Sequence, residues 1–255
     1  MTASNLIVSR VSLTADGEWD EFMAGYWASW LDPCQATGEL TFAHLGTGTT
    51  AEKEAFIKTK ESLLNEARAD PDNTVWLKCF NVHDNRIVGG GMYKIHRSNP
   101  YRAGAPTPIA DWFPEGSEKR ELAEAMYRQL WAWRARLMTE KHICGCALWV
   151  LPEYRSQGAA GLLLDQFVRH ADELQMEAYL EGTEMGVRLY KQYGFTVVSE
   201  ANLHFEPPAG KGGSAEWWRL VHDIQSHPVS IMWRPVGGQH GLMFPWEKGG
   251  AQSKL

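Results

Sequence analysis

A buried strand that runs through a turn of small residues into a helix is the feature that most restricts the fold of this chain. Residues 144–151 form a short apolar run, and Pro152 follows it directly. Residues 153–158 then lead into an amphipathic pattern over 159–174, with apolar residues at three- and four-residue steps. The sequence therefore predicts a strand, a tight turn and a helix whose N-terminus lies at the end of the strand.

This junction has the chemistry of a phosphate-binding site. The first turn of a helix has unpaired N–H groups and a partial positive charge. Gly158, Ala159 and Ala160 leave room for a diphosphate, and Arg155 adds a formal charge, although small residues at such a junction can also serve packing alone. Neither a Walker A loop nor a Rossmann fingerprint is present. Pro152 favours divergence from the neighbouring strand, which would leave backbone groups free for an extended ligand.

The rest of the chain predicts one α+β domain over 1–255. Hydrophobic periodicity indicates helices at 18–31, 51–67, 118–140, 184–193 and 217–224. Strands are predicted at 75–82, 86–95, 178–180, 195–198 and 229–233, with a bulge or close backbone approach at Gly89–Gly91. We expect 97–142 to be an insertion, a loop followed by the 118–140 helix, and 235–255 to be a loosely packed tail.

Charge and composition exclude several classes of protein. The 255 residues carry 25 basic and 31 acidic side chains, a net charge of -6, which argues against general binding to nucleic acid or anionic membranes. No run approaches the roughly 20 apolar residues of a membrane span, and residues 1–13 lack the pattern of a secretory signal. Four cysteines without a CxxC pair favour reduced thiols, so we expect a cytoplasmic protein.

Two motifs in the expected order resemble those of the GNAT superfamily of N-acetyltransferases. The first is Val150-x-Pro152-x-x-Arg155-x-x-Gly158-x-Ala160, which is similar to that superfamily's acetyl-CoA motif. The second, the segment Leu189-Tyr190-Lys191-Gln192-Tyr193-Gly194-Phe195, resembles its Leu-Tyr-x-x-x-Gly-Phe signature. The resemblance covers 140–200 and extends to the hairpin at 75–95. It implies a mixed, mostly antiparallel twisted sheet with flanking helices and strands splayed at the cofactor site.

The resemblance also implies acetyl-CoA as co-substrate and assigns residues to it. The pantetheine arm would pair with the backbone of Leu148, Val150 and Leu151. The diphosphate would lie on the amides of Arg155, Ser156, Gln157, Gly158, Ala159, Ala160 and Gly161, and Tyr193 would belong to the same site. Thr183 occupies a position where many relatives have an asparagine beside the cofactor arm.

Transfer to an amine requires groups that move protons. An alkylammonium with a pKa near 10 is only about one part in 10³ neutral at pH 7, so desolvation or a general base is needed. By the resemblance, Tyr190 would be the acid that protonates the departing sulfur, and Glu181 is the first choice for the base. Strand alternation places Cys144 and Cys146 on the face of Leu148 and Val150, where inert buried thiols are expected. His142 lies at the far end of that strand. The Cys-x-Cys pair lacks a second ligand pair, so no metal site is predicted.

The acceptor is expected to be a small-molecule amine that attacks directly in a ternary complex. The chain has 12 tryptophans, and an aromatic box with one carboxylate for a cationic or aryl amine is a hypothesis built on Trp27, Trp30, Asp111, Trp112 and Trp131. Core packing is the alternative role for these residues. Two other functions stay open: a peptide or protein N-acetyltransferase, against which the 97–142 insertion argues, and a coenzyme-A-binding module without catalysis.

Overall fold

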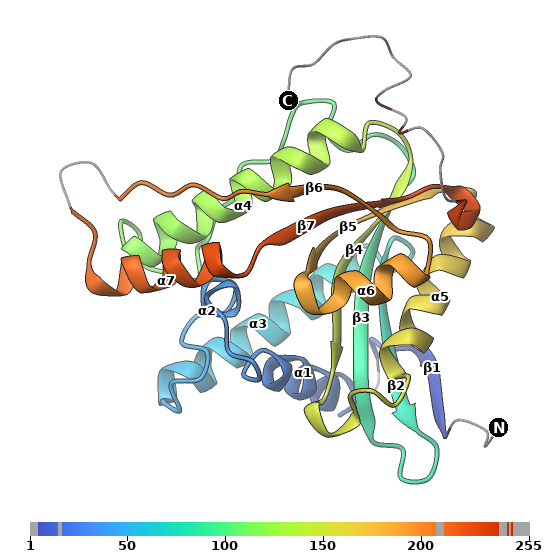
Figure 1. The fold of residues 1–255 in the computed structure, drawn as a ribbon. Coiled ribbons are helices and arrows are strands. Elements are labelled where there is room, and N and C mark those ends of the chain that lie inside the picture. The colour runs from blue at the N-terminus through green and yellow to red at the C-terminus, as the bar shows by residue number, and fades with distance from the viewer. Residues whose placement is uncertain (1–4, 15–16, 208–211, 240–243, 245, 247–255) are drawn as a thin grey trace.

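The computed structural model describes residues 5–14, 17–207, 212–239, 244 and 246, and within them a seven-stranded sheet flanked by helices (Figure 1). The strand order is β1-β2-β3-β4-β5-β7-β6. The strands are β1 (Leu6–Arg10), β2 (Thr74–Asn81), β3 (Ile87–His96), β4 (His142–Val150), β5 (Glu177–Thr183), β6 (Thr196–Ala201) and β7 (Val229–Arg234). All neighbouring pairs are antiparallel except β4 and β5, which are parallel. The predicted α+β class and mostly antiparallel sheet are confirmed.

Helices cover both faces of this sheet. They are α1 (Glu18–Ser29), α2 (Ala36–Thr41), α3 (Thr50–Ala69), α4 (Glu118–Leu137), α5 (Ala159–Glu173), α6 (Glu184–Gln192) and α7 (Ala215–Ser226), with one-turn 3₁₀ helices η1 (Pro152–Tyr154) and η2 (Val236–Gly238). The apolar residues of α5 and α6 pack on one face, against residues such as Leu77, Ile143 and Leu180. The other face is covered by α1 and α3 over one half and by α2, α4 and α7 over the other.

The glycines of β3 are explained by close side-chain packing. A Cβ at Gly90 would lie 2.3 Å from the Phe22 ring and 2.7 Å from Trp149 Nε1, so only glycine fits between α1 and β4. The register between β2 and β3 also shifts next to Gly89, where Gly89 pairs with Cys79 and Ile87 with Phe80. The expected bulge and the expected close approach are therefore both present. They allow the aromatic face of α1 to lie directly on the sheet.

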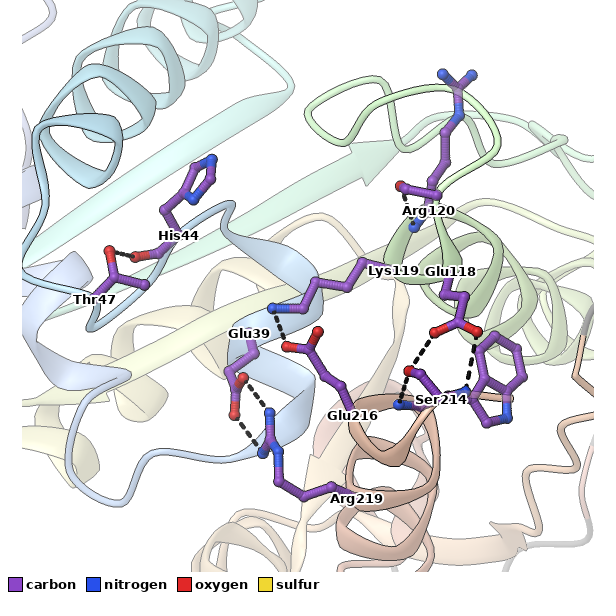
Figure 2. A network of polar contacts seen from close by, with 11 residues as sticks. Glu39, His44, Thr47, Glu118, Lys119, Arg120, Ser214, Glu216 and Arg219 are labelled. Carbon is purple, nitrogen blue, oxygen red and sulfur yellow. Dashed lines mark hydrogen bonds and ion pairs between the residues drawn. The ribbon is translucent and has the colours of Figure 1, made fainter. Parts of the chain in front are cut away.

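Polar contacts tie the insertion helix α4 to α2 and α7 (Figure 2). Arg219 of α7 donates two hydrogen bonds to Glu39 of α2, at 2.9 and 2.7 Å. Lys119 of α4 forms an ion pair of 2.9 Å with Glu216 of α7, and Glu118 accepts hydrogen bonds from Ser214. The three helices therefore form one connected wall on their side of the sheet.

The sequence patterns did not predict β1 and α2. Part of the expected tail, 235–255, lies within the described residues. The strand β1 pairs with β2 at the sheet edge, and the short helix α2 lies between α1 and α3. Of the expected loose tail, Phe244 and Trp246 stack with a ring-centroid distance of 4.9 Å, and both lie against Trp233. Residues 240–243, 245 and 247–255 lie outside the described part. Among the helices that the structure describes, none is long and apolar enough to cross a membrane.

Candidate active site

The parallel strands β4 and β5 separate halfway along their length. Their pairing runs from His142 with Glu177 to Gly145 with Leu180 and stops there. Beyond this point β4 stays paired with β3 up to Val150, whereas β5 stays paired with β7 up to Thr183. Each strand thus follows a different neighbour, and an opening forms between them. The divergence predicted at the end of β4 is present and begins at Gly145.

A β-bulge at Cys146 lies where the opening begins. Tyr93 of β3 pairs with Gly145, while the preceding Met92 pairs with Ala147, so Cys146 is the extra residue. The bulge shifts the alternation of β4 by one. Leu148 and Val150 therefore pack on the α5 face, whereas Cys144 and Cys146 face α4 and α7. The prediction that these four residues share a face was wrong, because simple alternation does not account for the inserted residue.

The backbone of β4 beside the opening is only partly occupied. The Leu151 N–H donates to the Val88 carbonyl at 2.9 Å, which removes it from the predicted pairing with a ligand. Because hydrogen-bonding directions alternate along a strand, the backbone groups of Leu148 and Val150 point toward the opening. The Val150 carbonyl is 3.4 Å from Arg155 Nε, a long hydrogen bond. The proposed contact at Leu151 is therefore corrected, and those at Leu148 and Val150 stay possible.

The turn after η1 and the first turn of α5 form a concave segment, 155–161, here called the cradle. Ser156 and Gly158 have positive φ values of 61° and 92°, which fold the backbone so that α5 begins at Ala159. The first hydrogen bond of the helix runs from the Leu162 N–H to the Gly158 carbonyl, so the N–H groups before it have no partner in the helix. A Cβ at Gly158 would meet nothing within 4 Å, whereas one at Gly161 would lie 3.1 Å from Tyr193 Oη.

A groove of about 830 Å³ contains the cradle and is here called the cofactor groove. Its walls include ten of the eleven predicted cofactor residues, all except Leu151: Leu148, Val150, Arg155, Ser156, Gln157, Gly158, Ala159, Ala160, Gly161 and Tyr193. Helix α6 also lines the groove, from Met185, which the sequence did not single out, to Gln192. The structure therefore brings residues from two distant motifs into one elongated groove.

Two residues of the groove are already hydrogen-bonded to other parts of the protein. The Arg155 guanidinium donates to the Asp32 carbonyl, so part of its hydrogen-bonding capacity is used within the protein. The Tyr193 hydroxyl donates to the Gly161 carbonyl at 2.8 Å, and the Tyr193 carbonyl accepts from Arg234 Nε at 2.7 Å. Arg234 is in turn paired with Asp172 at the end of α5. These contacts fix α6 against the cradle.

Beside the cofactor groove lies a second, smaller space of about 140 Å³, here called the inner cavity. Leu148, Thr183 and Tyr190 line both spaces, so they mark the junction. The inner cavity has walls from both faces of the sheet, for example Phe167 on the α5 face and Trp30 on the α1 face. A ligand in the groove would thus have one end in the opening between β4 and β5.

Tyr190 lies at this junction in a space made by two glycines. A Cβ at Gly182 would lie 3.1 Å from its ring, and one at Gly186 only 2.5 Å. Burial raises the pKa of Tyr190 to about 12, so the phenol stays protonated through the neutral range. No residue that the structure describes forms a hydrogen bond with its hydroxyl. The geometry is that of a proton donor available to a ligand.

Glu181 lines the inner cavity, but its carboxylate is bound to Arg134 of α4. Arg134 donates from Nε to Oε1 at 2.7 Å and from Nη2 to Oε2 at 2.6 Å, and the Tyr179 hydroxyl donates to Oε1 at 3.1 Å. Burial alone would lower the pKa of Arg134, but the adjacent Glu181 raises it well above its usual value. Both carboxylate oxygens therefore already accept hydrogen bonds from the protein, and these bonds hold Glu181 against α4.

The five residues of the hypothetical aromatic box do not line a single cavity: Trp27 and Trp30 contact Phe42, whereas Trp112 and Trp131 contact Tyr127. Trp27 is buried and donates from Nε1 to Glu52, while Trp112 donates to the Leu40 carbonyl. Trp131 stacks near Tyr127, and Asp111 is exposed. Only Trp30 of the five lines the inner cavity. The single box is therefore corrected: two of the indoles satisfy their N–H groups within the core, on separate elements.

Sequence reasoning missed Arg134, and a signal for it was present. It lies in the last turn of α4, four residues after the buried Leu130 and three before the buried Leu137. A charge on the core-facing side of a helix requires a buried partner. His142, by contrast, lies as expected at the start of β4, and it lines neither the groove nor the inner cavity. Among the described residues, no group of three or more His, Cys, Asp or Glu could hold a metal ion.

Comparison with known proteins supports this assignment of the fold. The model of the Acetyltransferase (GNAT) family matches residues 43–195, which is more than half of the chain. The chain therefore belongs to the GNAT acetyltransferase family, and membership supports acetyl-CoA-dependent N-acetyltransferase activity in general. A search of curated proteins found no match.

Solved structures share the fold at low sequence identity. Arylalkylamine N-acetyltransferase 2 from Aedes aegypti is 14% identical with a TM-score of 0.57, covering 91% of this chain and 99% of that one. The polyamine N-acetyltransferase of Drosophila melanogaster, described as forming N-acetylagmatine, is 16% identical with a TM-score of 0.55, covering 89% and 98%. A Corynebacterium glutamicum protein described as histone acetyltransferase HPA2 and related acetyltransferase is 14% identical with a TM-score of 0.51, covering 91% and 96%. These identities establish the fold alone.

Proposed function

We propose that this protein transfers an acetyl group from acetyl-CoA to the amine of a small molecule, with both substrates bound at once. The observation that carries the proposal is that Leu148, Thr183 and Tyr190 line both spaces, so the cofactor groove and the inner cavity adjoin at Tyr190. One ligand in each space would place the two reacting ends at the same point.

The groove fits the elongated shape and the chemistry of coenzyme A. The N–H groups of the cradle would hold the diphosphate, and the residues there have little or no side chain. The open backbone of Leu148 and Val150 would pair with the pantetheine arm, as strand addition does in peptide recognition. When bound, the co-substrate supplies an acyl thioester, whose carbonyl carbon accepts an amine while its sulfur departs.

Tyr190 is proposed as the acid for the departing sulfur. Its hydroxyl is protonated at neutral pH, and Tyr190 lines both spaces, so a sulfur atom held at the junction could receive its proton. Glu181 was the first candidate for the base. Its paired oxygens favour instead a positioning role, in which Glu181 and Arg134 hold β5 and α4 together beside the cavity.

The size of the inner cavity favours a small acceptor over a peptide. Its volume is about 140 Å³, and α4 belongs to the connected wall that closes this side of the sheet. The solved relatives from Aedes aegypti and Drosophila melanogaster are described by activity on arylalkylamines and on polyamines.

The four cysteines are all unpaired, which agrees with a cytoplasmic location where acetyl-CoA is made available.

The test is release of free thiol from acetyl-CoA in the presence of a panel of acceptors. The panel contains phenylethylamine, tyramine, agmatine, spermidine and a histone tail peptide, and mass spectrometry identifies the acetylated product. We expect at least one small amine to be acetylated and the peptide to be inactive. A response to the peptide alone would favour a protein acetyltransferase. Binding of acetyl-CoA without any transfer would favour a binding module.

A further inference from the structure

Four titratable side chains line the inner cavity, namely Tyr93, Cys146, Glu181 and Tyr190. Tyr93 hydrogen-bonds His170 at 2.7 Å, Glu181 is bound by Arg134, and Tyr190 is protonated at neutral pH. The Cys146 thiol donates to the Cys144 carbonyl at 3.4 Å, a contact within its own strand. Cys146 is therefore the member of this set that we consider as a proton acceptor.

The bulge in β4 is what places this thiol in the cavity. Cys146 is the inserted residue, and it lies where β4 leaves β5, on the wall that also contains Glu181. The other cysteines differ: Cys34 is exposed, while Cys79 and Cys144 are buried, and none of the three lines the inner cavity. Only Cys146 can thus meet an acceptor held next to Tyr190.

From this geometry we infer that the Cys146 thiolate accepts the proton that an ammonium acceptor must lose before it can attack. The inference rests on the proposed function and adds to it a proton acceptor at a named atom. An N–H bond of the ammonium breaks and an S–H bond forms at Cys146, while the amine keeps the electron pair. The Tyr190 hydroxyl gives its proton to the departing sulfur, and the phenolate takes the second proton from the nitrogen. Cys146 then releases its proton to solvent, which restores both groups.

Charges around the thiol support this role. Interaction with the Cys144 thiol, the largest effect, lowers the pKa of Cys146 to about 7, against the opposing effect of burial. The same interaction, together with burial, raises the pKa of Cys144 well above its usual value. A base works best when its pKa is close to the working pH, and only a thiolate is nucleophilic or basic.

The groups that act on Cys146 come from every element packed around it. Arg134 and Lys94 stabilise the thiolate of Cys146, whereas the carboxylate of Glu181 destabilises it. The charged or titratable neighbours are Lys94 on β3, Arg134 on α4, Cys144 on β4, Glu181 on β5, Tyr26 on α1 and Tyr101 in the loop after β3. Because both cations are held in ion pairs, with Glu66 and Glu181, their positions are fixed by the fold.

A first experiment measures the thiol without any acceptor. The full chain is alkylated with iodoacetamide over a pH series, and fragment ions in mass spectrometry distinguish Cys146 from Cys144. We expect alkylation of Cys146 to rise through about pH 7 and to be blocked by acetyl-CoA. Cys34 is the internal control, because burial raises the pKa of this thiol above the ordinary thiol range. A midpoint for Cys146 at or above that of Cys34 would overturn the inference.

A second experiment compares Cys146→Ser with Cys34→Ser on whichever amine of the panel the natural chain acetylates. For Cys146→Ser we expect kcat at pH 7 to fall by about 10²-fold, while the Kd for acetyl-CoA is unchanged. The deficit should shrink toward pH 10, where about half of the amine is neutral without help. Cys34→Ser should match the natural chain. A Cys146→Ser enzyme with the original rate and acid limb, or an acetyl group found covalently on Cys146, contradicts the role as base.

Failure of the Cys146 assignment can be distinguished from failure of the proposed function. If amines are acetylated but Cys146→Ser is unaffected, only the assignment of Cys146 is wrong. If acetyl-CoA binds and the thiol titrates near pH 7 but no amine is acetylated, the proposed function fails, and the assignment of Cys146 fails with it.

Discussion

Gly186 and Tyr190 lie one helical turn apart in α6, and the ring of Tyr190 fills the space that a side chain at Gly186 would need. A Cβ at Gly186 would lie 2.5 Å from Cε2 and 3.1 Å from Oη of Tyr190. A glycine inside a helix normally costs about 0.5–1 kcal/mol relative to alanine. Gly186 lies where the Tyr190 phenol reaches the junction of the two spaces. The position of the hydroxyl therefore depends on the absence of a side chain at residue 186.

Gly186→Ala should therefore displace the Tyr190 ring. We expect kcat to fall while the melting temperature changes little, because the gain of about 0.5–1 kcal/mol in helix propensity offsets the crowding. Steady-state kinetics and thermal unfolding check this. Gly212→Ala is the matched control, since a Cβ at Gly212 meets nothing within 4 Å. An unchanged kcat in Gly186→Ala would show that the ring position is not critical.

Removal of two hydroxyls one turn apart should have different effects. Tyr190→Phe is expected to lower kcat by about 10²-fold with little change in the Kd for acetyl-CoA, since only the proton donor is lost. Tyr193→Phe removes the hydrogen bond to the Gly161 carbonyl and should weaken acetyl-CoA binding instead. Isothermal titration and steady-state rates separate the two effects. If Tyr190→Phe turns over normally, the acid is another group.

Removal of one charge of the Arg134–Glu181 pair should destabilise the fold more than removal of both charges. Their side chains are 21% and 11% exposed, so Arg134→Met or Glu181→Gln alone leaves a charge in a nearly dry site. Each single change should lower the free energy of unfolding by about 3–5 kcal/mol. The double variant Arg134→Met/Glu181→Leu should recover much of the loss, as measured by urea denaturation. Additive losses in the double variant would contradict this coupling.

Acid should weaken the contact between α5 and β7. Hydrogen bonds from Arg234 are the main cause of the lowered pKa of Asp172, against the opposing effect of burial. A carboxyl with a lowered folded pKa stabilises the fold above its unfolded value of about 3.9, and this contribution is lost as the pH falls through the folded value. Asp172→Asn should thus lower the melting temperature at pH 7, and the difference from the natural chain should shrink below pH 4. A constant difference over that range would assign the effect to packing.

Local patterns predicted the parts of this fold that depend on neighbouring residues. The strand ending at Val150, the helix beginning at Ala159 and the cradle between them follow from periodicity and from small residues at fixed positions. The second motif placed Tyr190 and Tyr193 on the short helix that faces the cradle. The first of these assignments rested on local spacing, and the second on the resemblance of residues 189–195 to the GNAT signature.

Features that depend on distant pairing were not predictable from the same patterns. The bulge at Cys146 exists because β3 and β4 pair out of step by one residue, which no single-strand pattern records. Arg134 and Glu181 are separated by 47 residues and meet only because α4 crosses the sheet beside β5. Likewise, the indole of Trp27 donates a hydrogen bond to Glu52 on a different helix and lies in the core. In all three cases, contacts between residues distant in the sequence determine the local structure.

Under the proposed function, the two co-substrates would approach the passage between β4 and β5 from different sides of the sheet. Residues proposed to bind the donor belong to α5, α6 and the cradle, whereas Trp30 and Cys146 belong to the opposite layer. Side chains of α5, such as Phe167, also line the inner cavity, so the two binding surfaces share part of their walls. Substitutions at Trp30 should therefore alter acceptor preference with less effect on donor affinity than substitutions in the cradle.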